Sequence, residues 1–243
     1  MRQTRIYTSQ RLAANTQVLL DPGASAHVAR VLRLQEGDTL TLFDGSGGEY
    51  PAVICALTRK QVTVETGEHR VAERESDLHI HLGIAMSRGD RMDWVMQKAT
   101  ELGVAAVTPL FTERTEVKLS AERAAKKLRH WQQVMTSACE QCGRNRLPQL
   151  PDIRRLDAWL ADTTAQRKFV MHHRASGQAG NTGKPSSVAL LVGPEGGLTE
   201  GEIEAAAHAG YSALRLGPRV LRTETAPLAG IAILQARWGD MSA

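Results

Sequence analysis

From residue 78 onward, short apolar strands alternate with amphipathic helices, and this alternation limits the chain to few folds. Strands are predicted where apolar and β-branched residues cluster or alternate, and helices where apolar residues recur every three to four positions. Strands that alternate with helices form a largely parallel sheet with helices on both faces. The sequence therefore predicts an α/β domain, with strands at 78–84, 104–108, 168–172, 188–192 and 213–216 and helices at 87–102, 120–142, from 199 onward and at 225–238.

Two of these helices are preceded by sequences typical of capping boxes, in which a hydroxyl and a carboxylate satisfy the first amides of a helix. One is Ser87-Arg88-Gly89-Asp90 and the other is Thr199-Glu200-Gly201-Glu202. The long helix at 120–142 is predicted to end at Gly143, since glycine commonly terminates helices.

The first seventy or so residues follow a different pattern. Short β-branched runs at 18–20, 39–43, 52–56 and 61–65 are separated by turn sequences, which is typical of a small barrel or sandwich. One helix is expected at 25–34, where Ala26, Ala29, Val31 and Leu32 have helical spacing. A charged, poorly periodic stretch at 71–77 separates the two patterns, so we predict domains at 1–72 and 73–243.

Composition and charge exclude several classes of protein. No apolar run approaches the ~20 residues that a membrane-spanning helix needs, so no membrane association is expected. Three cysteines are too few for a disulfide framework, which favours the cytoplasm. Cys139 and Cys142 form a C-x-x-C motif without a second half, so packing in a helix is the simpler interpretation and no metal is expected. A net charge of +4 is compatible with a polyanionic partner without demanding one.

Two glycine-rich loops stand where an open α/β sheet binds ligands, just beyond the carboxyl ends of strands. The first, Gly193-Pro194-Glu195-Gly196-Gly197-Leu198, lies between an apolar strand and a capped helix. It matches neither dinucleotide nor P-loop motifs, and it is either a ligand-binding loop or simply a turn. The second runs from Leu216 to Ala226 and combines arginines, threonines and a glutamate, although Arg222 and Glu224 could merely pair with each other at the surface.

The two loops together resemble the signature of the SPOUT-class methyltransferases. More narrowly, they resemble the small-subunit methyltransferase E family, which methylates uracil N3 in bacterial 16S ribosomal RNA. The resemblance covers nearly the whole chain, because further segments also match: 43–46, 79–83, 86–89, 97–98, 101–104, 108–111 and 139–145.

This resemblance implies features that periodicity alone does not indicate. The C-terminal domain is expected to contain a trefoil knot, the N-terminal barrel to be a PUA-like RNA-binding module, and the protein to be a homodimer that acts on 16S ribosomal RNA of the small ribosomal subunit. The cofactor implied is S-adenosyl-L-methionine. The residues expected to bind it are His172, Gly193, Pro194, Gly196, Gly197, Leu216, Gly217, Val220, Leu221, Thr223 and Ala226.

Methylation of uracil N3 requires loss of the N3 proton, and the target base must be unpaired or flipped out. Glu195 and Glu224 are the candidate proton acceptors, while Arg219 and Arg222 are candidates to stabilise negative charge on the uracil oxygens. The sequence does not rank these four residues.

RNA contacts are expected from five arginines. The alternative is that these arginines simply lie on a solvated surface, where nearby acidic residues nearly balance their positive charge. Two other functions stay open: a non-catalytic RNA-binding or ribosome-assembly factor, and a tRNA methyltransferase of the same fold. The five arginines are Arg5, Arg11, Arg30 and Arg33 in the N-terminal barrel and Arg88 in the C-terminal domain.

Overall fold

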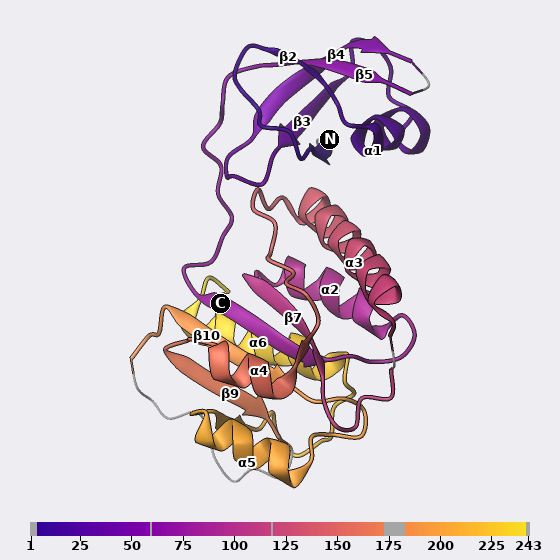
Figure 1. The fold of residues 1–243 in the computed structure, drawn as a ribbon. Helices are drawn as coiled ribbons and strands as arrows, with labels where there is room; N and C mark the ends of the chain where they lie inside the picture. The colour runs from indigo at the N-terminus through magenta and orange to yellow at the C-terminus, as the bar shows by residue number, and fades with distance from the viewer. Residues whose placement is uncertain (1–3, 59, 118, 173–182, 242–243) are drawn as a thin grey trace. The chain divides into compact units, whose positions relative to one another are not determined.

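The computed structural model describes residues 4–58, 60–117, 119–172 and 183–241. The chain divides into two compact units, which are shown in Figure 1. The N-terminal unit comprises Met1–Glu75 and also Thr136–Leu147, and the C-terminal unit comprises Ser76–Met135 and Pro148–Ala243. The contribution of Thr136–Leu147 to the N-terminal unit was not evident from the sequence.

The N-terminal unit is built on a five-stranded sheet with the order β1-β3-β4-β5-β2. β1 pairs with β3 in parallel, and the other neighbours are antiparallel. Its core consists mainly of inward-facing aliphatic side chains, among them Ile6, Leu40, Leu42, Ile54 and Val64. The strands are β1 (Arg5–Tyr7), β2 (Gln17–Leu19), β3 (Thr39–Phe43), β4 (Tyr50–Leu57) and β5 (Val62–Thr66).

The helical segment of this unit starts earlier than predicted. α1 covers Pro22–Ala26 and continues into a π-helical turn, η1, at His27–Val31. The Asp21 side chain accepts a hydrogen bond from the Ala24 amide at 2.9 Å, and Pro22 at the first helical position favours this start. The expectation of one helix at 25–34 was therefore wrong at both ends, because Asp21-Pro22 acts as a helix start rather than as a turn.

The C-terminal unit contains a six-stranded sheet with the order β11-β9-β10-β6-β7-β8. Every pair of neighbours is parallel, as the alternation of strands and helices predicts. The pairing of β8 is too short to be recognised in the sequence. The strands are β6 (His79–Ala85), β7 (Ala106–Phe111), β8 (Arg154–Arg155), β9 (Arg167–Met171), β10 (Ser187–Val192) and β11 (Ser212–Leu214).

Helices cover both faces of this sheet, as β10 shows. Leu190 and Val192 pack into the same cluster as side chains of α2 (Arg91–Glu101), α3 (Ala121–Cys142) and α6 (Thr225–Trp238). The intervening Leu191 belongs to the cluster that contains α4 (Leu156–Asp162) and α5 (Glu200–His208). Since successive residues of a strand point to opposite faces, the two groups of helices lie on opposite sides of the sheet (Figure 1). No helix in the described part of the chain is long and apolar enough to cross a membrane.

One predicted helix cap is confirmed and the other is wrong. Thr199 and Glu202 form the reciprocal capping box at the start of α5. α2 instead begins at Arg91, after an N-cap Asp90 whose side chain makes no capping hydrogen bond. Ser87 therefore lies before the helix, and its buried hydroxyl has no hydrogen-bond partner among the described residues. The local sequence matched the motif, but the chain from β6 takes extra residues to reach α2.

Candidate cofactor-binding site

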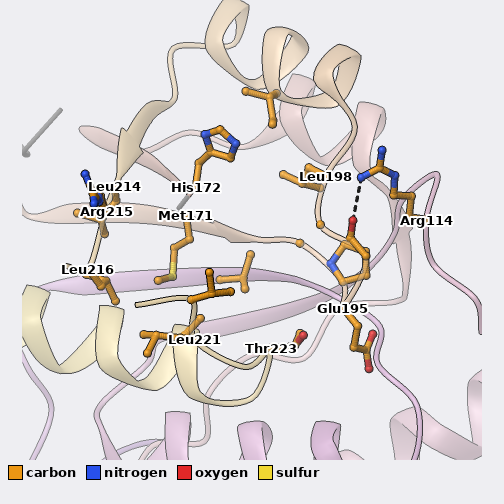
Figure 2. A pocket seen from close by; sticks show the side chains of 18 of the residues that line it. Arg114, Met171, His172, Glu195, Leu198, Leu214, Arg215, Leu216, Leu221 and Thr223 are labelled. Atoms are coloured by element: carbon orange, nitrogen blue, oxygen red, sulfur yellow. Dashed lines mark hydrogen bonds between the residues drawn. The ribbon is translucent and has the colours of Figure 1, made fainter. Parts of the chain in front are cut away.

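The two glycine-rich loops follow β10 and β11, which both pair with β9. Because parallel strands end at the same edge of a sheet, the two loops meet there. Between them lies a cavity of about 610 Å³, which is within the range typical of small-molecule sites. The side chains around it are shown in Figure 2. All of the residues that we expected to bind the cofactor line this cavity: His172, Gly193, Pro194, Gly196, Gly197, Leu216, Gly217, Val220, Leu221, Thr223 and Ala226.

The cavity is lined by both apolar and charged residues. Met171, at the end of β9, contributes to the apolar lining, and His172 follows it. Figure 2 shows both side chains on the side opposite Arg114. The remaining apolar lining comes from Val192, Pro194, Leu198, Ile203, Leu214, Leu216, Val220, Leu221 and Ala226, and the charged lining from Arg114, Glu195, Glu200, Glu204, Arg215 and Arg219.

The first loop is a tight turn whose shape depends on its glycines. The Gly197 amide donates to the Pro194 carbonyl at 2.9 Å, and Gly197 has a φ of +69°, which favours glycine. At Gly193, a Cβ would lie 3.1 Å from the Leu198 backbone nitrogen, so a side chain there would force the turn open. The Arg114 guanidinium donates to the Gly196 carbonyl at 2.8 Å and holds the outer side of the loop (Figure 2).

The four candidate catalytic residues separate into two pairs. Glu195 and Arg219 line the cavity, whereas Arg222 and Glu224 do not. The Arg222 carbonyl accepts hydrogen bonds from the amides of Thr225 and Ala226, which start α6. No ion pair joins Arg222 to Glu224 among the described residues; Glu224 lies instead 3.7 Å from Arg91.

Several residues at the site were not predicted from the sequence. Arg91 pairs with Glu195 as well as with Glu224, and Arg114 reaches the first loop from the segment after β7. Arg114 could have been suspected, because β7 is parallel to the strands that carry the glycine loops and the segment after it meets the same edge. The sequence contains no comparable signal for Arg91.

The structure changes the interpretation of Arg5 as an RNA contact. Its side chain is only 11% exposed, it pairs with Glu49 and Asn145, and its guanidinium lies 5.1 Å from the centre of the Phe43 ring. An arginine that is buried and paired in this way supports the fold, so its surroundings favour a structural role over contact with a phosphate. Arg11, Arg30 and Arg33 are exposed. Arg88 is also exposed and pairs with Glu116 at 2.9 Å.

Cys139 of the C-x-x-C motif and His81 of β6 both have structural surroundings. Burial raises the pKa of the Cys139 thiol to about 12, and this thiol contacts the Arg146 carbonyl at 3.7 Å. His81 lies 2.8 Å from the Thr108 hydroxyl and packs edge-on against Trp159, and burial, followed by the charge of Arg154, lowers its pKa. Across the described residues, no group of three or more His, Cys, Asp or Glu side chains is placed to hold a metal ion.

Comparison with known proteins gives consistent results for both units. The RNA methyltransferase domain family matches residues 74–235, and the RNA methyltransferase PUA domain family matches residues 20–66. The chain is 33% identical to ribosomal RNA small subunit methyltransferase E of Buchnera aphidicola subsp. Schizaphis graminum, over 98% of each chain. It is 32% identical to the protein of the same name from Bacillus subtilis, over 83% of each chain.

Solved structures resemble the chain over its whole length. A ribosomal RNA small subunit methyltransferase E from Neisseria gonorrhoeae, bound to S-adenosyl methionine, has a TM-score of 0.94 and 40% identity, with 99% of this chain and 100% of that chain covered. A putative methyltransferase from Legionella pneumophila, in complex with the same cofactor, has a TM-score of 0.96 and 42% identity at the same coverage.

Proposed function

This chain belongs to the ribosomal RNA small subunit methyltransferase E family, and we propose that it methylates N3 of a uridine in 16S ribosomal RNA with S-adenosyl-L-methionine as the methyl donor. The observation that carries the proposal is the cavity that lies between the two glycine loops. Every residue expected to bind the cofactor lines it, in a chain whose full-length structural relatives bind this cofactor.

The cavity fits such a cofactor in size and chemistry. Its volume of about 610 Å³ suits a ligand of this size, its apolar lining suits an adenine ring, and the charged residues around it suit the polar ends of the molecule. The cofactor supplies an electrophilic methyl group when bound. The tight turn at Gly193–Gly197 and the backbone near Gly217 present amide and carbonyl groups at the cavity wall, and we assign to them the binding and orientation of the cofactor.

Of the four catalytic candidates, we retain Glu195 and Arg219 as residues that can reach the reacting groups, because only these two line the cavity. In this assignment Glu195 accepts the N3 proton and Arg219 stabilises negative charge on the uracil oxygens. Arg222 and Glu224 then have supporting roles in the second loop. The expected result is that Glu195→Gln and Arg219→Gln each lower kcat, and that Arg219→Gln does so with little change in cofactor affinity.

Two measurements test the main proposal. Calorimetric titration of the protein with S-adenosyl-L-methionine should give saturable binding, and 16S ribosomal RNA from cells lacking the protein should lose one N3-methyluridine. Absence of cofactor binding would favour the non-catalytic RNA-binding or assembly factor. Loss of a methyl group from tRNA instead of ribosomal RNA would favour the tRNA methyltransferase.

We assign RNA binding to the N-terminal unit, in which residues 20–66 match the RNA methyltransferase PUA domain family. Arg11, Arg30 and Arg33 are exposed there and can approach phosphates. Replacing all three with glutamine should weaken RNA binding and flatten its salt dependence, because fewer counterions are released, while cofactor affinity stays unchanged. Unaltered salt dependence would move the RNA contact to Arg88 and Arg219 in the C-terminal unit.

We also propose that the protein is a homodimer that acts in the cytoplasm, and that its C-terminal unit contains a trefoil knot. The dimer proposal is supported by α6, where Ile233 is 47% exposed although Ile231 and Leu234 beside it are buried in the core. A helix that is apolar on its outer side as well as its inner side suits a subunit contact. A monomeric mass by light scattering at micromolar concentration would contradict the dimer.

A further inference from the structure

Arg91, the first residue of α2, contacts a carboxylate from each of the two glycine loops. Its Nη1 donates to Oε1 of Glu195 in the first loop, and its Nε lies 3.7 Å from Oε2 of Glu224 in the second loop. Arg91 thus connects two loops that are far apart in sequence through a third element. It does not itself line the cavity between them.

The backbone of Arg91 is held in place by the helix that it begins. Met92, Val95 and Met96 of α2 are buried in the main core of the C-terminal unit, so the first turn of α2 is anchored to the sheet. The Arg91 side chain extends from this anchored point and is 40% exposed. An arginine suits this task, because its planar guanidinium offers several donors and can engage two carboxylates at once.

The ion pair with Glu195 lies in a wall that two cavities share. Besides the cavity between the loops, a second one of about 480 Å³ is lined by residues before and at the start of α2. Glu195 lines both cavities. In Figure 2 the Glu195 carboxylate points away from Met171 and His172. The second cavity is lined by Arg88, Gly89, Asp90, Arg91, Glu116 and Glu195.

We infer that Arg91 is a positioning residue that fixes the spacing of the two cofactor loops by holding Glu195 and Glu224. The inference rests on the proposed function for the identity of the cofactor. Ion pairs as exposed as these contribute little to global stability, because solvent screens them. Their effect is on the binding site, since loops held at the correct spacing before binding need not be ordered by the cofactor.

The test compares Arg91→Gln and Arg91→Lys with a matched control, Arg155→Gln. Arg155 pairs with Asp157 on the surface of the same unit and lines neither cavity. We expect Arg91→Gln to raise the dissociation constant for S-adenosyl-L-methionine about tenfold and to lower kcat for RNA methylation. Arg91→Lys should recover part of the affinity, because the lysine ammonium group keeps the positive charge but lacks the planar set of donors with which a guanidinium engages two carboxylates. The control should match the wild type, and all melting temperatures should agree within a few degrees.

A double-mutant cycle separates positioning from a general effect of charge. Glu224→Gln should weaken cofactor binding by itself but add little when Arg91 is already glutamine, because the same contact has been removed. Equal cofactor affinity and kcat in Arg91→Gln and the wild type, or fully additive effects of the Arg91 and Glu224 changes, would overturn the inference. Failure of the wild type to bind the cofactor would instead reject the proposed function.

Discussion

Replacing Gly193 with alanine tests whether the tight turn at 193–198 shapes the cofactor site. A Cβ at this position would lie 3.0 Å from Leu198 Cγ and 3.1 Å from the Leu198 backbone nitrogen. The Leu198 side chain can rotate away but its backbone cannot, so the turn must open by a few tenths of an ångström. Overpacking of this kind costs about 1–3 kcal/mol, which corresponds to a melting temperature lower by roughly 2–12 °C for a chain of this size.

The cofactor should bind more weakly to the opened turn. If binding must restore the original turn, the same cost is subtracted from the binding free energy, and the dissociation constant rises by about 5- to 150-fold. Calorimetric titration with S-adenosyl-L-methionine measures this change. Gly201→Ala is the matched control, because Gly201 lies in the first turn of α5 with no heavy atom within 4 Å of the added Cβ. Wild-type affinity in Gly193→Ala would refute the role assigned to this turn.

Three further predictions concern the fold of the C-terminal unit. Since burial lowers the pKa of His81 below its ordinary value of 6.5, the unfolded chain takes up a proton that the folded chain does not, and stability should fall as the pH drops below about 6.5. Urea titrations at pH 7.5 and 5.5 should show a smaller pH effect in His81→Gln than in the wild type, and an equal effect would contradict this. Gly83→Ala should destabilise by about 1–3 kcal/mol, because the Cβ would lie 2.5 Å from the Trp159 ring; an unchanged denaturation midpoint would show that Trp159 moves without cost. The indole Nε1 of the buried Trp131 donates a hydrogen bond to Asp93 Oδ1 at 3.0 Å. Asp93→Ala removes this acceptor and should lower the free energy of unfolding by about 1–3 kcal/mol, whereas Asp93→Asn keeps an acceptor oxygen and should retain most of the stability.

The position of the site was predictable because it depends on local features. The glycine loops follow apolar strands and precede helices whose periodicity is visible in the sequence, and parallel strands bring such loops to one edge. These local features indicated that the loops at 193–198 and 216–226 would lie at one edge of the sheet, whereas the assignment of His172 and of individual loop residues to the cofactor came from the family resemblance. The sequence also determined the start of α5, because Thr199 and Glu202 are three residues apart and interact within one helical turn.

Whether a charged side chain is accessible or already paired was decided only by the tertiary structure. Arg5 was one of several N-terminal arginines until folding brought Glu49 and Asn145 to it from distant segments. Arg91 stood in no recognisable motif until folding placed it beside both Glu195 and Glu224. α2 likewise begins at Arg91, later than the local capping motif predicted. Periodicity reports which residues share a strand or a helix face, over distances of a few residues. It contains no information about strand order, and in this chain strand order and helix packing determine which charges meet across the sequence.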